Sequence, residues 1–287
     1  MIKMFDNKKN NNVKVDVTSL ILRYGVKVAA TITLLSIVFV IIYILLKGVP
    51  HLTADLFAWK YNSDNVSLLP ALVNTVYMAV ISLAIAVPIG IGSAIYLVEY
   101  AGRGNKFVEI IRITAETLSG IPSIVYGLFG SLFFVKFMEI GLSMLSGALT
   151  LSIMILPLIM RSSEEALLAV PMSYREGSFG LGAGKLRTVF KIVLPSAIPG
   201  ILSGVILGIG RIVGESAALI FTAGTVAEVA TSVFDSTRTL SVHMYTISGE
   251  GLYINQTYAT AVVLLVLVII INAISELIAK KIGGSNE

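Results

Sequence analysis

Residues 195–223 read PSAIPGILSGVILGIGRIVGESAALIFTA. This stretch is predominantly apolar over more than the roughly 20 residues that a helix needs to cross the bilayer, because the hydrocarbon layer is about 30 Å thick and each residue advances about 1.5 Å. It also contains an arginine, Arg211, and a glutamate, Glu215, near the expected middle of the span. The stretch therefore predicts a membrane-spanning helix that carries charge.

The rest of the chain has the same apolar character. Of its 287 residues, 56% are hydrophobic and only 13% are charged, and the mean hydropathy is +0.89. A soluble domain of this size could not bury so much apolar surface. The fold class is therefore predicted to be an all-α membrane protein with six transmembrane helices. The six candidate spans are residues 26–46, 71–97, 114–136, 140–160, 195–223 and 258–279.

The Lys and Arg residues predict the orientation. Most of the 21 basic residues fall before the first span, in the even-numbered loops or after the last span. The odd-numbered loops hold few, and short cytoplasmic loops carry the excess of basic residues. Both termini are thus expected to be cytoplasmic. The chain divides into a cytoplasmic tail (1–25), a first transmembrane helix (26–46) that is long enough to be an anchor rather than a cleaved signal, and a main domain of five helices (70–280).

The charged loop at residues 161–194 is expected on the cytoplasmic side. Ser162 followed by Glu165 is a capping-box pattern and predicts a short helix that ends near Pro171. A second helix is predicted from Pro171 to the glycines around Gly182, because proline suits a first helical position and glycine ends helices. The loop is thus predicted to hold two short helices at an angle.

The two charges of the fifth span have the spacing of a helical pair. Residues four apart lie on one helix face, with Cβ atoms about 6 Å apart, so Arg211 and Glu215 are expected to pair. A charge near the bilayer centre costs roughly 2.5–3.5 kcal/mol and is tolerated where it faces the bundle interior or water. One interpretation is a buried ion pair that only fixes packing. The other is that Arg211 lines a pathway for an anion and Glu215 holds it in place. Gly200, Gly204 and Gly208 also form a ridge of small residues suited to close helix contact.

Other polar residues are interpreted as structural. His51 and His243 fall in external loops and are expected at the polar surface. Glu164 is expected in the first turn of a helix, where the helix dipole favours a negative charge. Tyr126 and Asn74 lie on spans, where packing and local hydrogen bonding are the simplest roles.

The chain supplies no ATPase of its own. Gly184 and Lys185 resemble part of a phosphate-binding loop, but Phe179 and Leu186 stand where that loop requires glycine and a magnesium-binding Ser or Thr. The chain has no cysteine, so it holds no disulfide and no thiolate metal site. No enzyme activity and no cofactor are expected, and any process driven by ATP must draw its energy from a partner.

The 161–194 loop resembles the signature loop of the type I permease subunits of ABC importers. The matching residues are Glu176, Gly177, Ser178, Gly182, Ile192, Leu194 and Pro195, with Gly-Ser where Ala-Ala is usual. The resemblance implies a MetI-like fold, and it implies that Glu176, Gly177, Ser178 and Gly182 belong to a coupling helix seated in a groove of a cytoplasmic ATPase. The alternative is an ordinary amphipathic loop on the membrane surface.

Three stretches within residues 70–280 are similar to phosphate permease subunits of the PstA type. They are residues 95–100 (IYLVEY), 119–129 (SGIPSIVYGLF) and 211–223 (RIVGESAALIFTA). The similarity implies import of inorganic phosphate across the bacterial cytoplasmic membrane, with a sister permease PstC, a dimer of the ATPase PstB and the phosphate-binding protein PstS as partners. Another oxyanion, such as sulfate or molybdate, stays open. A membrane enzyme or sensor is disfavoured, since the spans lack histidine, cysteine and paired carboxylates.

Overall fold

The computed structural model describes residues 17–102 and 104–283, so most of the predicted tail lies outside the described residues. The chain divides into two compact units, one ending at Leu46 and the other beginning at Lys47. The first unit holds most of α1 (Val17–Gly48), which contains the first candidate span. By length and composition this helix is able to cross a membrane.

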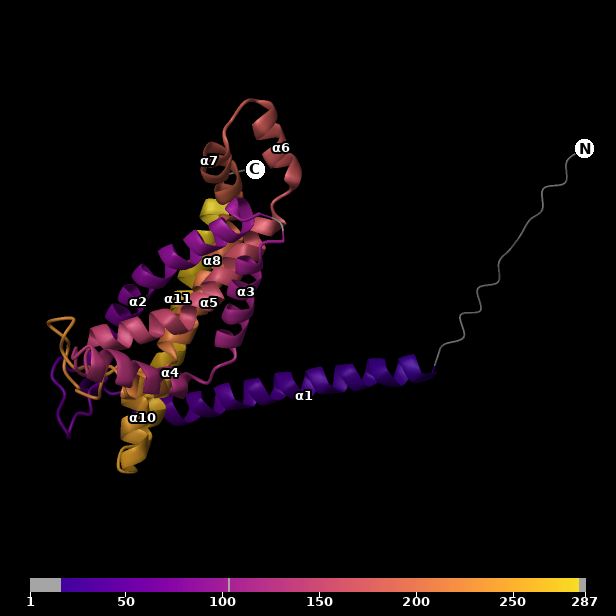
Figure 1. Cartoon of the computed structure of the whole chain (residues 1–287). Helices are drawn as coiled ribbons and strands as arrows, with labels where there is room; N and C mark the ends of the chain where they lie inside the picture. Colours follow the sequence, from indigo (N-terminus) through magenta and orange to yellow (C-terminus); the bar gives the residue numbers. More distant parts are fainter. Residues whose placement is uncertain (1–16, 103, 284–287) are drawn as a thin grey trace, which may run out of the picture. The chain divides into compact units, whose positions relative to one another are not determined.

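The second unit is a helical bundle (Figure 1). Its longer helices are α2 (Leu69–Ile95), α3 (Lys106–Ser119), α5 (Met144–Ala169), α8 (Leu194–Val213), α10 (Leu240–Glu250) and α11 (Ile254–Gly283). Its shorter helices are α4 (Ser123–Gly130), α6 (Met172–Gly180), α7 (Lys185–Thr188) and α9 (Ala217–Ile220). Three π-helical segments continue α2, α4 and α7: η3 (Tyr96–Tyr100), η4 (Ser131–Phe137) and η5 (Val189–Val193).

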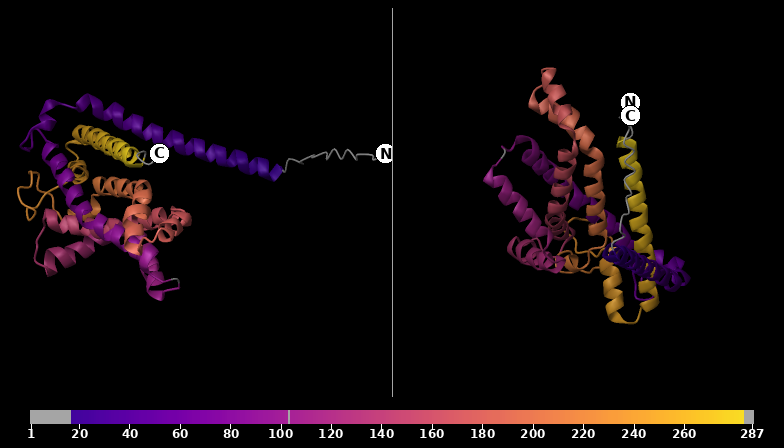
Figure 2. Two further views of the ribbon diagram at one scale, coloured as in Figure 1. Left: turned by 90° about the horizontal axis from the view of Figure 1, so that it is seen from above. Right: turned by 90° about the vertical axis from the view of Figure 1, so that its right-hand side faces the viewer.

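Helix α5 forms the centre of this bundle, and α2 and α8 pack against it. Its side chains Leu151, Ile155 and Ile159 are fully buried, and they join Met78 of α2 and Ile212 of α8 in the main apolar core. Helices α6 and α7 lie at one end of the bundle and α10 at the other (Figure 1). Helix α11 runs along the bundle and packs against α8 and α10 (Figure 2). The functional candidates therefore fall into two groups, one within the bundle and one at the α6 end.

The third predicted span is wrong as a single helix. The segments Lys106–Ser119 and Ser123–Phe137 meet at an angle of 103°. Helix α3 ends at Ser119, and Pro122 caps the start of α4 with an extended ψ of 142°. Proline disfavours helical backbone in the residue before it, and glycine at position 120 weakens the helix further. With five long apolar helices and this bent pair counted as one, the described chain has up to six spans.

The fifth span begins and ends earlier than predicted. Its helical stretch runs from Lys185 to Val213 instead of over 195–223. Gly214 ends it, and the apolar residues that follow form a separate turn of helix, α9. The hydropathy of residues 217–223 hid this break, because an apolar run looks the same in sequence whether its helix is continuous or interrupted.

The fourth span is longer than predicted, and the capping-box interpretation is wrong. Helix α5 continues without a break from Met144 to Ala169, so no separate helix starts after Ser162. The residues before Ser162 are already helical, which leaves no free amide for its side chain to cap. The Ser162 hydroxyl instead donates to the Gly200 carbonyl of α8 across a distance of 3.4 Å.

The ridge of glycines on α8 is confirmed as a close helix contact. A Cβ built at Gly200 would lie 2.7 Å from the Cβ of Ala166, and one built at Gly204 would overlap the side chain of Ser162. At Gly208 the nearest atoms, those of Ile159, would lie at an ordinary 3.8 Å. The small residues therefore let α8 approach α5 closely along its first half.

Candidate functional site

Helix α6 and the turn after it have the form that the sequence predicts. Pro171 precedes the helix with an extended ψ of 138°, and Gly182 ends it in the left-handed region with φ of +77°. The chain then turns back into α7, and the hydroxyls of Ser178 and Thr188 lie 2.8 Å apart, which joins the two helices. Helices α6 and α7 with η5 form a small projecting element (Figure 1).

The four signature residues face different ways. Glu176 and Gly177 are exposed, and a Cβ at Gly177 would meet no atom within 4 Å. Ser178 is only 5% exposed because its hydroxyl faces α7. Gly182 provides the turn. Glu176 and Gly177 are thus open to a partner on a helix that also exposes Tyr174 and Phe179, whereas Ser178 and Gly182 shape the element from within.

An exposed leucine completes this surface and was missed from the sequence. Leu181, directly before the turn at Gly182, is 91% exposed. Contiguous exposed apolar side chains often mark protein contacts, and Phe179, two residues earlier, is also exposed. In the sequence, only its position beside the signature residue Gly182 could have marked Leu181 as exposed. An apolar residue in an amphipathic loop is otherwise expected to be buried.

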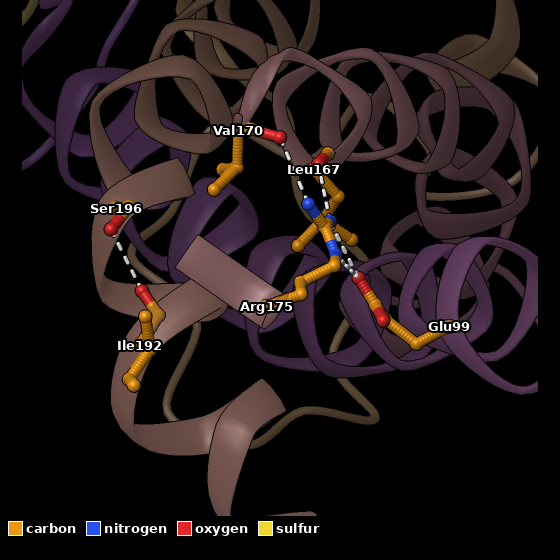
Figure 3. A network of polar contacts seen from close by, with 6 residues as sticks. All are labelled: Glu99, Leu167, Val170, Arg175, Ile192 and Ser196. Carbon is orange, nitrogen blue, oxygen red and sulfur yellow. Dashed lines mark hydrogen bonds and ion pairs between the residues drawn. The ribbon is translucent and has the colours of Figure 1, made fainter. Parts of the chain in front are cut away.

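Arg175, the residue before Glu176, ties α6 to two other helices (Figure 3). Its Nε and Nη2 donate to Oε1 of Glu99 in η3 at 3.0 and 2.7 Å. Its Nη1 donates to the carbonyl of Val170 at 2.9 Å, and Nη2 also donates to the carbonyl of Leu167 at 3.0 Å. One guanidinium therefore links the end of α2, the end of α5 and α6.

This ion pair is shielded from water. The side chains of Arg175 and Glu99 are 10% and 9% exposed. Removing one partner of a buried ion pair typically costs about 3–5 kcal/mol, because the other charge is left uncompensated. No sequence pattern predicts the pair, because the partners are 76 residues apart. In the sequence, Arg175 stands out only as one basic residue of the 161–194 loop. Glu99 stands out only as part of residues 95–100, which are similar to phosphate permeases.

A second ion pair lies near the same end of the bundle. Arg112 of α3 contacts Glu164 of α5, with Nε donating to Oε1 at 2.7 Å and Nη2 at 2.5 Å. The expectation that Glu164 opens a helix is wrong, since it lies inside α5. A cavity of about 1040 Å³ opens between these elements, and its walls include Glu99, Arg112 and Arg175.

The predicted pairing of Arg211 with Glu215 is wrong. The described structure contains no ion pair between them, because α8 ends at Val213 and the chain turns before Glu215. The Glu215 carboxylate is buried and accepts a hydrogen bond from the Ala218 amide at 3.0 Å. The helical spacing of four holds only while the helix continues, and Gly214 interrupts it.

Arg211 is left as an uncompensated charge in the last turn of α8. Its side chain is partly exposed, and it makes no ion pair or hydrogen bond with the described residues. Its charge acts on the hydroxyl of Tyr126 in α4. That hydroxyl donates to the Leu118 carbonyl at 2.8 Å, so the packing role expected for Tyr126 is confirmed. A guanidinium without a carboxylate partner can attract an anion at this point.

The opposite end of the bundle is held by buried polar groups. Asn74 of α2 donates to the Glu228 carbonyl at 2.8 Å and accepts from the Ala230 amide at 3.0 Å, which confirms its structural role. The expectation that His243 is a surface residue is wrong, because it is 0% exposed in α10. Burial, and then the positive charge of Arg238, lower the pKa of His243 to about 3. Its imidazole is therefore neutral at physiological pH.

Comparison with known proteins identifies a matching protein family and similar permease proteins. The family model described as binding-protein-dependent transport system inner membrane component matches residues 86–284. The probable ABC transporter permease protein YqgI of Bacillus subtilis (strain 168) is 35% identical over 225 residues, which are 73% of this chain and 76% of that protein. The phosphate transport system permease protein PstA 1 of Mycobacterium tuberculosis (strain CDC 1551 / Oshkosh) is 40% identical over 154 residues. That alignment covers 54% of this chain and only 50% of the relative.

A solved structure shares the fold. It is described as inward-facing conformations of the MetNI methionine ABC transporter, and the matched chain superposes with a TM-score of 0.59 at 20% identity. The match covers 75% of this chain and 94% of that one. At this identity the likeness concerns the fold alone.

Proposed function

Because this chain belongs to the family of binding-protein-dependent transport system inner membrane components, we propose that it is the permease subunit through which an ABC importer moves inorganic phosphate into the cell. Membership of the family makes it an all-helical ABC importer permease subunit with a MetI-like fold, and such subunits are not enzymes themselves. The identity of the cargo is the further step.

The observation that carries the proposal is the unpartnered charge of Arg211 in an apolar helix. A desolvated cation without a carboxylate is costly in a bilayer unless it serves an anion or faces water. Its partial exposure leaves it accessible, and the relative at 40% identity is named a phosphate permease. In this proposal Arg211 lines the pathway. Glu215, fixed four residues further on by the Ala218 amide, adds a negative charge that keeps the resting affinity for an anion low.

The proposal is tested by uptake of labelled phosphate in cells that carry Arg211→Gln or Arg211→Lys, with the membrane level of the protein measured in parallel. We expect loss of uptake with Gln and partial retention with Lys, which keeps the charge. Normal uptake with Arg211→Gln at a normal protein level contradicts the role of Arg211. Excess sulfate or molybdate should not compete with phosphate. Competition by either identifies another oxyanion as the cargo.

The second part of the proposal concerns the ATPase. Glu176, Gly177 and Leu181 present an open, exposed surface at the tip of the α6 element, and Ser178 and Gly182 hold its shape. We assign this surface to docking on a cytoplasmic ATPase. Glu176→Lys and Leu181→Asp should each reduce copurification of the ATPase, and unchanged copurification of both contradicts the assignment.

The remaining partners are proposed from the same similarity to phosphate permeases. In a phosphate importer the sister permease would be PstC, the ATPase dimer PstB and the binding protein PstS. Docking of α6 on an ATPase requires the α6 end to be cytoplasmic and the α10 end to be external, as the distribution of basic residues predicts. Because the chain has no cysteine, labelling of a single cysteine introduced at Ser173 tests this directly. Labelling from outside the intact cell contradicts the orientation.

A further inference from the structure

We infer that the ion pair between Arg175 and Glu99 is the linkage through which a displacement of α6 reaches α2. The inference rests on the proposed docking of α6 on the ATPase. It assigns to Arg175 a positioning role in coupling, distinct from the outward surface that touches the partner.

Little besides Arg175 connects α6 to α2 among the described residues. Helix α6 packs against α7 and η5, which continue into α8, so its packing contacts lead to α8 and not to α2. The polar contacts from α6 to α2 and α5 are made by Arg175 alone among the described side chains of α6. On one side α6 borders the cavity of about 1040 Å³, whose walls include Met172, Arg175 and Phe179, so it is not packed there.

The geometry of the contact holds the Arg175 guanidinium in one place. Four hydrogen bonds from one planar guanidinium fix its position relative to Glu99 and to the carbonyls of Leu167 and Val170 (Figure 3). The contact is buried, so water does not compete for these bonds and salt screens the ion pair only weakly. A planar group held at several points transmits a displacement in any direction, whereas a single flexible contact would give way.

The linkage ends on a long helix of the bundle. Glu99 lies in η3, the π-helical continuation of α2, and α2 packs along α5 in the main core. A pull on Glu99 therefore acts on the end of a long helix of the bundle. The neighbouring Arg112 and Glu164 join α3 to α5 and do not involve α6. This second ion pair, in which the Arg112 side chain is 50% exposed, provides a control at the same end of the molecule.

The experiment uses the full importer, reconstituted with its ATPase and binding protein, and measures labelled phosphate transported per ATP hydrolysed. For Glu99→Gln and Arg175→Gln we expect this ratio to fall roughly 2- to 30-fold, the range over which single residues change coupling. Copurification of the ATPase should be unchanged. Arg112→Gln should leave the ratio within about twofold of wild type. A ratio that falls equally in Arg112→Gln, or does not fall in Glu99→Gln and Arg175→Gln, overturns the inference.

A second measurement does not depend on the cargo. Spin labels on cysteines introduced at Ser173 of α6 and Tyr96 of η3, both exposed, report the distance between the two helices. In the wild-type background this distance should stay constant when ATP binds, because the helices move together. With Glu99→Gln it should change or broaden. A distance that changes equally in both backgrounds shows that the pair does not transmit the movement.

These outcomes separate the inference from the proposed function. If Glu176→Lys and Leu181→Asp leave ATPase binding intact, the docking assignment fails, whatever the ion pair does. If the wild-type importer moves no phosphate, the cargo assignment fails, and the distance measurement still decides the linkage. If docking and phosphate transport both stand and the two variants remain coupled, only the linkage is wrong.

Discussion

Glu215 accepts a hydrogen bond from the Ala218 amide at 3.0 Å, and this contact starts a new turn of helix directly after α8 has ended. The carboxylate therefore caps the first turn of α9 instead of pairing with Arg211. The hydroxyl of Ser241 in α10 also donates to the Glu215 carbonyl. A single residue therefore joins the break in the fifth span to the opposite end of the bundle.

The cap and the proposed pathway charge can be separated by substitution. Glu215→Gln keeps an oxygen acceptor for the Ala218 amide, so stability should stay near wild type, whereas phosphate uptake should fall because the negative charge is gone. Glu215→Ala removes the acceptor and should cost about 0.5–2 kcal/mol as well. Thermal unfolding of the purified protein and uptake in cells give the two readouts. Full uptake with Glu215→Gln would limit Glu215 to the capping role.

The close contact of α8 with α5 predicts a position-dependent effect of alanine. Gly204→Ala would place a methyl group in the Ser162 side chain and should lower stability by about 1–3 kcal/mol, the usual cost of overpacking. Gly210→Ala is the control, because a Cβ there meets no atom within 4 Å and alanine favours the helix. Thermal unfolding in detergent compares the two. Equal stability of both variants would mean that α8 lies further from α5 than the structure shows.

Asn74 should be among the most sensitive polar positions of the bundle. Asn74→Ala leaves the Ala230 amide and the Glu228 carbonyl without their partner, and each buried group left unsatisfied costs about 1–3 kcal/mol. The expected result is a clear loss of thermal stability and faster proteolysis of the loop that contains Glu228. Asn272→Ala, at an exposed position of α11, is the control and should behave like wild type. A thermally silent Asn74→Ala would contradict these contacts.

The buried His243 predicts a pH dependence of stability. Its pKa of about 3 in the fold lies below the usual 6.5, so between these values the unfolded chain binds a proton that the folded chain does not. Stability from this residue is complete above pH 6.5 and falls toward pH 3, by up to about 1.4 kcal/mol per pH unit. His243→Leu should flatten the decline between pH 6.5 and 5, as measured by unfolding in detergent.

Much of the fold could be predicted because lipid imposes simple requirements. A helix that meets lipid must be apolar and long, which made α2, α5 and α11 visible in the hydropathy. Helix α6 was visible because Pro171 and Gly182 constrain the backbone locally, independently of the rest of the fold.

The errors arose where an apolar sequence conceals a break or where contacts are distant in the chain. The end of α8 was missed because apolar residues continue beyond Gly214, and the bend before α4 because Pro122 could equally have kinked a continuous helix. The pairing of Glu99 with Arg175 depends on how α2, α5 and α6 converge. No periodicity within one segment encodes that convergence, so only the folded chain reveals it.

The π-helical segments η3 and η5 bear on how the α6 element could move. One holds Glu99, the ion-pair partner of Arg175 in α6, and the other joins α7 to α8, so π-helical turns lie at two of the places where the element meets long helices. The hydrogen bonds of a π-helical turn span one residue more than those of an α-helical turn. The helix can gain or lose this extra residue when it switches between the two forms. Rotation of a neighbouring helix can thus be absorbed without unravelling it. We expect amide exchange at residues 96–100 and 189–193 to be faster than in the α-helical turns beside them, and to slow when the ATPase is bound.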